Sequence, residues 1–244
     1  MRRLSVAARR YRVIICLVVA TWLALMLAGC GVARPATPGT SASNLPTPTP
    51  IPTPSMAEAD DILRIFNPQA PTTLNPHRTL SSKDFEPARI TYEPLASFDR
   101  DGRLMPFLAA EIPTVENGGV AADGMSVTWK LRQDVQWSDG QPFTADDVLF
   151  TYEYVTNPAT AASTAPSYSN VARVEVVDPY TVKVVFKTST SAWAVPFVGT
   201  QGMILPRHVF QAYTGANAAT APANTLPVGT GPYRVMDPGI KPQE

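Results

Sequence analysis

The chain has 244 residues, 45% hydrophobic and 16% charged, a globular composition that excludes collagen-like and fully disordered proteins. Its 20 basic and 20 acidic residues balance, but five arginines and no acid lie within the first 12 positions. If residues 1–29 are removed, as argued next, 15 bases face 20 acids and the net charge is about −5. Such a chain lacks the basic face that binds nucleic acid, so we expect no nucleic-acid partner.

Residues 1–29 have the pattern of a secretory signal peptide. The arginines precede an apolar run at 13–28, and small residues follow before Cys30. The alternative is a membrane-spanning helix, but the run has 16 residues and a bilayer needs about 20. We therefore predict that this segment is cleaved and that the protein lies outside the cytoplasm.

The cleavage site resembles the lipobox of bacterial lipoproteins, in the sequence Leu27-Ala28-Gly29-Cys30. The resemblance implies that Cys30 is acylated, becomes the new N-terminus and anchors the protein to the membrane. The other cysteine, Cys16, leaves with the signal peptide, so no thiol remains in the folded part. Disulfides, zinc–cysteine sites and cysteine nucleophiles are thereby excluded.

A disordered linker is predicted at residues 30–56. It holds seven prolines among serines and threonines, and Arg34 is its only charged residue. Such a segment buries too little apolar surface to fold, and its prolines favour an extended spacer. A proline-recognition ligand is the alternative interpretation.

The folded body begins with two predicted elements. Ile62, Leu63, Ile65 and Phe66 indicate a strand that ends at Asn67-Pro68. A short helix is predicted from Lys83 to Tyr92, with one face that is listed here: Phe85, Ala88, Arg89 and Tyr92.

Further along the chain, strands and helices alternate. Residues 126–132 alternate polar and apolar side chains and predict a strand. Thr144 is a predicted N-cap with an acid three residues on, and its helix runs to Asn157-Pro158. Residues 174–177 and 181–186 predict a hairpin. The fold class is therefore α/β with a mixed sheet.

Catalytic chemistry is not indicated. His77 and His208 have no partner at metal-ligand spacing and are interpreted as ordinary polar residues. Gly229-Thr-Gly231 lacks the lysine of a phosphate loop and is predicted to be a tight turn into a strand. The Asp146-Asp147 pair is interpreted as complementing a helix dipole. We predict no catalytic residue, no cofactor and no metal site.

A series of motifs occurs in order along about residues 60–236, and the most specific is Trp137-Ser-Asp-Gly-Gln-Pro-Phe-Thr-Ala-Asp-Asp-Val148. The others are Tyr92-Glu-Pro-Leu95, Asp99-Arg-Asp-Gly102, Pro106-Phe-Leu-Ala109, Trp129-Lys-Leu-Arg132, Asp178-Pro-Tyr-Thr181, Leu205-Pro-Arg-His208 and Gly229-Thr-Gly-Pro-Tyr233. Together these motifs resemble the family 5 extracellular solute-binding proteins, the oligopeptide and dipeptide receptors of ABC importers.

The resemblance implies a periplasmic-binding-protein-like bilobal fold, of which this chain holds only an incomplete first lobe. The expected main domain comprises residues 57–92 and 171–244, and a small subdomain comprises residues 93–170. The second lobe is expected to be missing, which implies a fragment, a truncated gene product or a second chain.

The resemblance also suggests which residues meet the solute. Leu80, Ser81 and Ser82, in the loop after Leu74-Asn-Pro76, are the predicted substrate-binding residues together with Tyr168. The alternative for each is a solvent-exposed loop residue. Trp129 and Trp137 are interpreted as core anchors rather than ligand platforms.

The expected function is that of a non-enzymatic, extracytoplasmic receptor that captures peptides and delivers them to ABC permease subunits. The same family with another solute, such as a metal chelate, an oligosaccharide or a small organic molecule, is the nearest alternative. An extracytoplasmic interaction or sensory module without transport is the second, and a surface hydrolase is the third.

Overall fold

The structure is a computed structural model that describes residues 69–79 and 81–236. All of these residues belong to one compact unit, Leu63–Glu244. The predicted signal peptide, Cys30, the linker, the strand at 62–66 and Leu80 lie outside the described residues.

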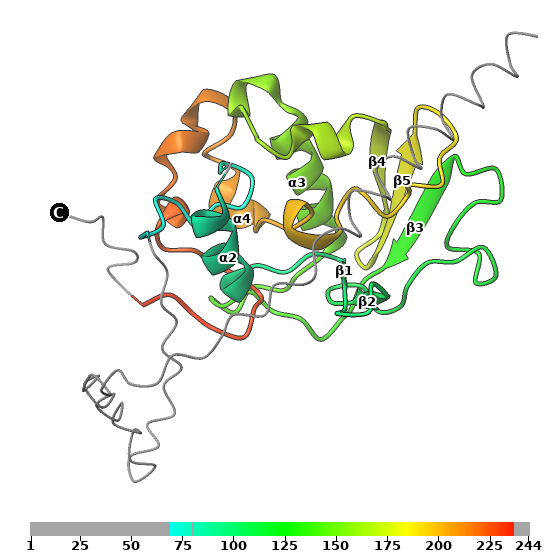
Figure 1. Ribbon diagram of the computed structural model, residues 1–244, viewed down its shortest axis with the longest axis horizontal. Coiled ribbons are helices and arrows are strands. Elements are labelled where there is room, and N and C mark those ends of the chain that lie inside the picture. The colour runs from blue at the N-terminus through cyan, green and yellow to red at the C-terminus, as the bar shows by residue number, and fades with distance from the viewer. Residues whose placement is uncertain (1–68, 80, 237–244) are drawn as a thin grey trace, which may run out of the picture. The chain divides into compact units, whose positions relative to one another are not determined.

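A three-stranded antiparallel sheet forms one side of the described unit (Figure 1). Its strands are β3 (Ser126–Lys130), β4 (Val171–Asp178) and β5 (Thr181–Phe186), in the order β3-β5-β4. The predicted hairpin is confirmed, and Val174 pairs with Val184 in its register. Val127 and Trp129 alternate with half-exposed neighbours and are fully buried, so the alternating pattern identified this strand correctly.

Helix α3 (Ala145–Thr156) packs against β4 and β5, and Figure 1 shows it lying beside this sheet. Thr144 is its N-cap, as predicted. The carboxylate of Asp147 accepts a hydrogen bond from the Thr144 N–H at 3.0 Å, which satisfies a donor at the helix start. The hydrophobic core that includes residues of α3 and the sheet contains Val148, Tyr154 and Val182, all of them fully buried.

Helix α2 (Ser82–Thr91) forms where the sequence predicts it, and its buried face agrees with the predicted one in part. Ala88 and Tyr92 are buried as predicted and Arg89 is exposed, whereas Asp84 and Thr91 are buried although the pattern did not include them. Asp84 is buried because the loop before the helix supplies its partners, including the Thr72 N–H at 2.7 Å and the Thr79 hydroxyl at 2.8 Å. An apolar periodicity cannot anticipate a buried carboxylate of this kind.

A second, two-stranded antiparallel sheet consists of β1 (Ala96–Phe98) and β2 (Leu104–Pro106). Ala96 also forms an isolated parallel bridge with Val198. The remaining elements are short: helix α4 (Arg207–Phe210) and 3-10 turns at Pro158–Thr160, Ala165–Tyr168, Gly199–Gln201, Gly215–Thr220 and Pro222–Asn224. The loop at 69–79 lies against this last part, because the Leu74 N–H donates to the Asn224 carbonyl at 2.6 Å.

The predicted strand after Gly231 is wrong for the residues that can be seen, since 233–236 form no strand. Gly229 instead meets α2 and the turn at Ser138: a Cβ at this glycine would lie 1.8 Å from the Thr91 carbonyl oxygen. The Gly231 N–H donates to that same oxygen at 2.9 Å. The segment is thus held by single backbone hydrogen bonds and not by a strand ladder.

The predicted subdomain boundary at residue 170 falls inside the three-stranded sheet, because β3 precedes it and β4 follows it. The division into a small subdomain and a main domain stays a prediction.

Candidate functional site

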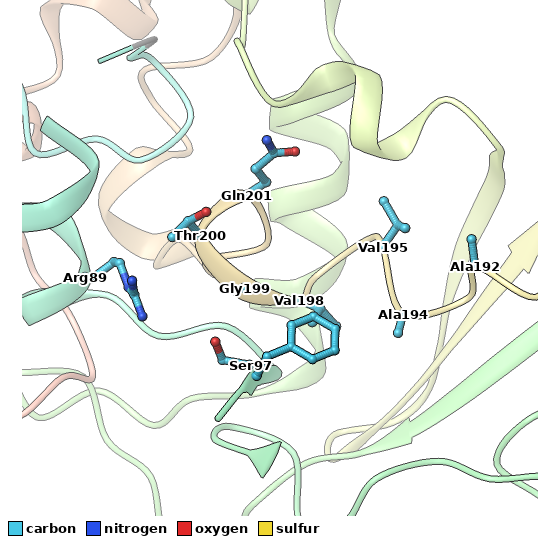
Figure 2. A pocket seen from close by; sticks show the side chains of 10 residues that line it. Arg89, Ser97, Ala192, Ala194, Val195, Val198, Gly199, Thr200 and Gln201 are labelled. Atoms are coloured by element: carbon cyan, nitrogen blue, oxygen red, sulfur yellow. The ribbon is translucent and has the colours of Figure 1, made fainter. Parts of the chain in front are cut away.

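A pocket with a volume of about 620 Å³ lies between the end of α2, strand β1 and residues 192–201 (Figure 2). We call it the Arg89 pocket. Its polar lining consists of Arg89, Ser97, Thr200 and Gln201. Its apolar lining consists of Phe98, Ala192, Ala194, Val195 and Val198, with Gly199 between the two groups. This combination of apolar walls and a few polar groups is typical of small-molecule sites.

A tight turn at residues 197–202 shapes one side of the Arg89 pocket. Phe197 has a left-handed backbone with φ 63°, which a residue with a side chain adopts only where its surroundings enforce it. Its carbonyl accepts a hydrogen bond from the Leu95 N–H at 3.0 Å. Gly202 is needed as glycine, because a Cβ there would lie 2.0 Å from the Val198 nitrogen.

His77 fastens the chain just after this turn. Its Nε2 lies 2.7 Å from the Met203 carbonyl oxygen and its Nδ1 lies 2.7 Å from the Thr164 hydroxyl. A carbonyl only accepts, so Nε2 carries the proton and Nδ1 accepts from Thr164. Complete burial lowers the pKa of His77 to about 4, although the Met203 hydrogen bond opposes that shift. His77 is therefore a neutral, buried support for the turn.

The sequence-predicted substrate-binding residues are not brought into the Arg89 pocket. Ser81 is half-buried and Ser82 is exposed, at the other end of α2 from Arg89, and Leu80 lies outside the described residues. Tyr168 has 1% of its surface exposed, and its ring lies edge-on to Phe197 with centroids 5.1 Å apart. Tyr168 thus contacts the turn from behind. Solute binding by these four residues stays a prediction.

The residues that line the pocket were missed by sequence reasoning, which placed Arg89 on the packed face of its helix. One signal was present: a cation in the last turn of a short helix, directly before the Tyr92-Glu-Pro-Leu95 motif. Ser97 and Thr200 lie in segments whose sequences give no such signal.

A smaller hollow of about 270 Å³ lies where α3 begins and α4 begins. We call it the His208 pocket; it is lined by Gln141, Pro142, Thr144, Asp146, Asp147, Arg207, His208 and Gln211. Its charges are paired: Arg207 contacts Asp146 at 3.1 Å, and His208 Nε2 lies 2.7 Å from an oxygen of Asp139.

Asp147 is the buried centre of the His208 pocket. Its carboxylate accepts from the Arg207 N–H at 2.9 Å, from the Thr144 N–H at 3.0 Å and from Trp137 Nε1 at 3.2 Å. Desolvation raises its pKa, although these hydrogen bonds act in the opposite direction. Trp137 has only 2% of its surface exposed and Trp129 has none, so both predicted core anchors are confirmed.

Within residues 69–79 and 81–236, no three His, Cys, Asp or Glu side chains gather in a group that could hold a metal ion. Across the same part of the chain, no helix is both long enough and apolar enough to cross a bilayer.

Comparison with known proteins identifies relatives over about two thirds of the chain. The chain is 30% identical over 164 residues to the glutathione-binding protein GsiB of Salmonella paratyphi A, covering 67% of this chain and 30% of GsiB. It therefore spans about 30% of the length of the curated relatives that it matches first.

Solved structures with the same fold include NikZ of Campylobacter jejuni in complex with Ni(L-His), with a TM-score of 0.56 and 27% identity. That match covers 68% of this chain and 31% of NikZ. Haemophilus influenzae OppA in complex with the peptide RPPGFSPFR has a TM-score of 0.58 and 26% identity, covering 70% and 35%. These neighbours are bilobal periplasmic binding proteins, so the expected α/β fold class, with part of one lobe present, is confirmed.

Residues 103–244 match the family described as bacterial extracellular solute-binding proteins, family 5 Middle. This match covers more than half of the chain. It includes strands β2 to β5, helix α3 and the turn that shapes the Arg89 pocket. The chain belongs to the family 5 extracellular solute-binding proteins.

Proposed function

We propose that this protein is the extracytoplasmic solute-binding component of an ABC importer, and that it captures peptides and delivers them to permease subunits. Proteins of this family are transport binding proteins and not enzymes. Relatives that bind glutathione and the peptide RPPGFSPFR favour a peptide as the solute here.

The observation that carries this proposal is the Arg89 pocket. Its volume of about 620 Å³ falls within the range of small-molecule sites, and its walls suit both a polar backbone and apolar side chains. Thr200 and Gln201 lie on the turn that Phe197 and Gly202 constrain, so these polar groups are held in place before any solute arrives.

A metal chelate is the second candidate solute, because NikZ binds Ni(L-His) and is 27% identical to this chain. Among the described residues that line the Arg89 pocket there is no His, Cys, Asp or Glu, the side chains that would ligate nickel directly. A chelate would therefore be held through its organic part.

Isothermal titration of the purified protein tests the solute. We expect saturable heats with tripeptides and weaker or absent heats with nickel–histidine and with maltotriose. Mass spectrometry of the recovered peptide should show no cleavage. If nickel–histidine binds and peptides do not, the proposal of a peptide solute is wrong. If the peptide is hydrolysed, the proposal of a non-enzymatic receptor is wrong.

We further propose that Cys30 carries the lipid that holds the protein at the membrane. The Cys30→Ala variant should move from the membrane fraction to the soluble fraction, while the folded body keeps its circular dichroism spectrum. If the variant stays in the membrane fraction with an uncleaved leader, the apolar run at 13–28 is sufficient as an anchor and the lipid is not needed.

A further inference from the structure

We propose that Arg89, Ser97 and Thr200 form a subsite for a carboxylate group of the solute. The inference rests on the proposed function, since it names the part of the solute that the Arg89 pocket recognises. It predicts that the solute is an acid with an apolar group beside the carboxylate, such as a short peptide with a free C-terminus.

Most polar groups of the Arg89 pocket have no partner among the described residues. Among the described residues, Arg89 forms no ion pair, and neither the Ser97 hydroxyl nor the Thr200 hydroxyl forms a hydrogen bond. The Gln201 side-chain oxygen accepts from the Ser167 hydroxyl, which leaves the Gln201 amide N–H groups free. Four neighbouring side chains therefore offer unused donors to one space.

The charge of the Arg89 pocket also favours an anion. Among the residues that the structure describes, no acidic residue lines the pocket, and the Arg89 guanidinium is the single formal charge there. Figure 2 shows Arg89 extending from α2 toward β1, with the Ser97 hydroxyl turned toward it. A carboxylate offers only acceptors, and it matches the planar guanidinium in a pair of parallel hydrogen bonds.

A competing explanation is that Arg89 only complements the dipole of α2, whose last turn it occupies. That role requires a cation near the last carbonyls and makes no use of Ser97 or Thr200. It also leaves unexplained why donors from α2, β1 and the turn at 199–201 line the same hollow.

Exposed apolar side chains also line the Arg89 pocket. Phe98 has 58% of its surface exposed and Val195 has 47%, and both line the pocket. Exposed apolar side chains beside a polar subsite are typical of ligand-binding surfaces. They fit an apolar side chain on the residue that bears the carboxylate.

The test uses two peptides that differ only in that group, Ala-Ala-Phe and its C-terminal amide, titrated into the purified protein. We expect the acid to bind at least about tenfold more tightly than the amide, the scale of a charge-assisted hydrogen bond. Arg89→Gln should weaken the acid by about the same factor and leave the amide unchanged. Arg100→Gln removes an exposed arginine outside the pocket and serves as the matched control, with no expected effect.

A third peptide, Ala-Glu-Phe amide, distinguishes a C-terminal from a side-chain carboxylate. If this peptide binds as tightly as the acid, the carboxylate subsite is supported, but the group that it recognises is a side-chain carboxylate. If the acid and the amide bind with equal affinity, or if Arg89→Gln weakens both equally, the carboxylate subsite is wrong, whereas the proposed receptor function is unaffected.

If no peptide binds at all, the proposed function fails, and a second probe still decides the subsite. Ligand-observed NMR with 3-phenylpropionate and its amide should then show Arg89-dependent binding of the acid alone. Absence of that preference overturns the subsite as well.

Discussion

The Arg89 pocket and the His208 pocket both contain charged side chains, but among the described residues only the His208 pocket has its charges paired. In the His208 pocket, Asp146 contacts Arg207, and the Asp147 carboxylate accepts three N–H donors. In the Arg89 pocket, the guanidinium and two hydroxyls have no partner among the described residues. Groups that satisfy one another stabilise the fold, whereas donors held without partners are available to a solute.

The largest expected effect tests the structural side of this comparison. Trp137→Ala should lower the free energy of unfolding by about 3–5 kcal/mol, the range for removing a buried aromatic side chain. It also removes the Nε1 donor to Asp147 at 3.2 Å. Urea unfolding measures the loss, and Phe98→Ala, at 58% exposure, is the control with little expected change. A Trp137→Ala protein that unfolds like the parent but no longer binds peptide would place Trp137 in the solute site.

The second prediction concerns the support of the Arg89 pocket and depends on pH. The pKa of His77 falls from 6.5 to about 4 on folding, so the unfolded chain binds the proton more readily between these values. The contribution of neutral His77 to the free energy of unfolding is therefore fully present above about pH 6.5 and decreases as the pH falls toward 4. The total loss is about 3 kcal/mol.

Unfolding measured at pH 7, 5.5 and 4.5 follows that loss. His77→Gln removes the titrating ring, so part of the decline should disappear, whereas His208→Gln should keep it. An unchanged pH profile in His77→Gln would show that His77 is not the responsible group.

The third prediction compares two neighbouring acids of the His208 pocket. Asp147→Asn places an amide where N–H donors converge, and should cost about 2 kcal/mol because buried donors lose their acceptor. Asp146→Asn breaks only an ion pair in which the Asp146 side chain is 54% exposed, and should cost less than about 1 kcal/mol. Equal losses in parallel thermal melts would mean that burial does not separate the two carboxylates.

The same two regions show what the sequence could predict. Local patterns predict the hairpin, the Thr144 cap and the core roles of Trp129 and Trp137, and the structure confirms them. The alternating strand predicted at 126–132 is also present and ends at Lys130. Local patterns are sufficient for these elements because the apolar face of each one is determined by a few consecutive residues.

The site was less predictable, because it depends on contacts between distant segments. Asp84 is buried against Thr72 and Thr79 of the preceding loop and is also paired with Lys83. The exposure of Arg89 on the same helix is likewise not evident from the local pattern. Ser97 and Thr200 come together because their segments are joined by the bridge between Ala96 and Val198 and by the backbone hydrogen bond from Leu95 to Phe197. The family resemblance correctly identified the receptor class and left the polar groups of the pocket unidentified.

The last prediction concerns the exposed pair of His208 and Asp139, for which we expect the smallest change. His208 and Asp139 are paired at 2.7 Å, but their side chains are 34% and 36% exposed, so the pair contributes at most about 1 kcal/mol. Burial acts to raise the pKa of Asp139, but the hydrogen bonds from His208 and the Gln141 N–H outweigh it, and the pKa is lowered. His208→Gln should therefore leave stability at pH 7 nearly unchanged, and the affinity for Ala-Ala-Phe should be that of the parent protein. A clear loss of peptide affinity, with the melting temperature unchanged, would place the paired charges of the His208 pocket in the solute site, and partnered groups would no longer distinguish structure from binding in this chain.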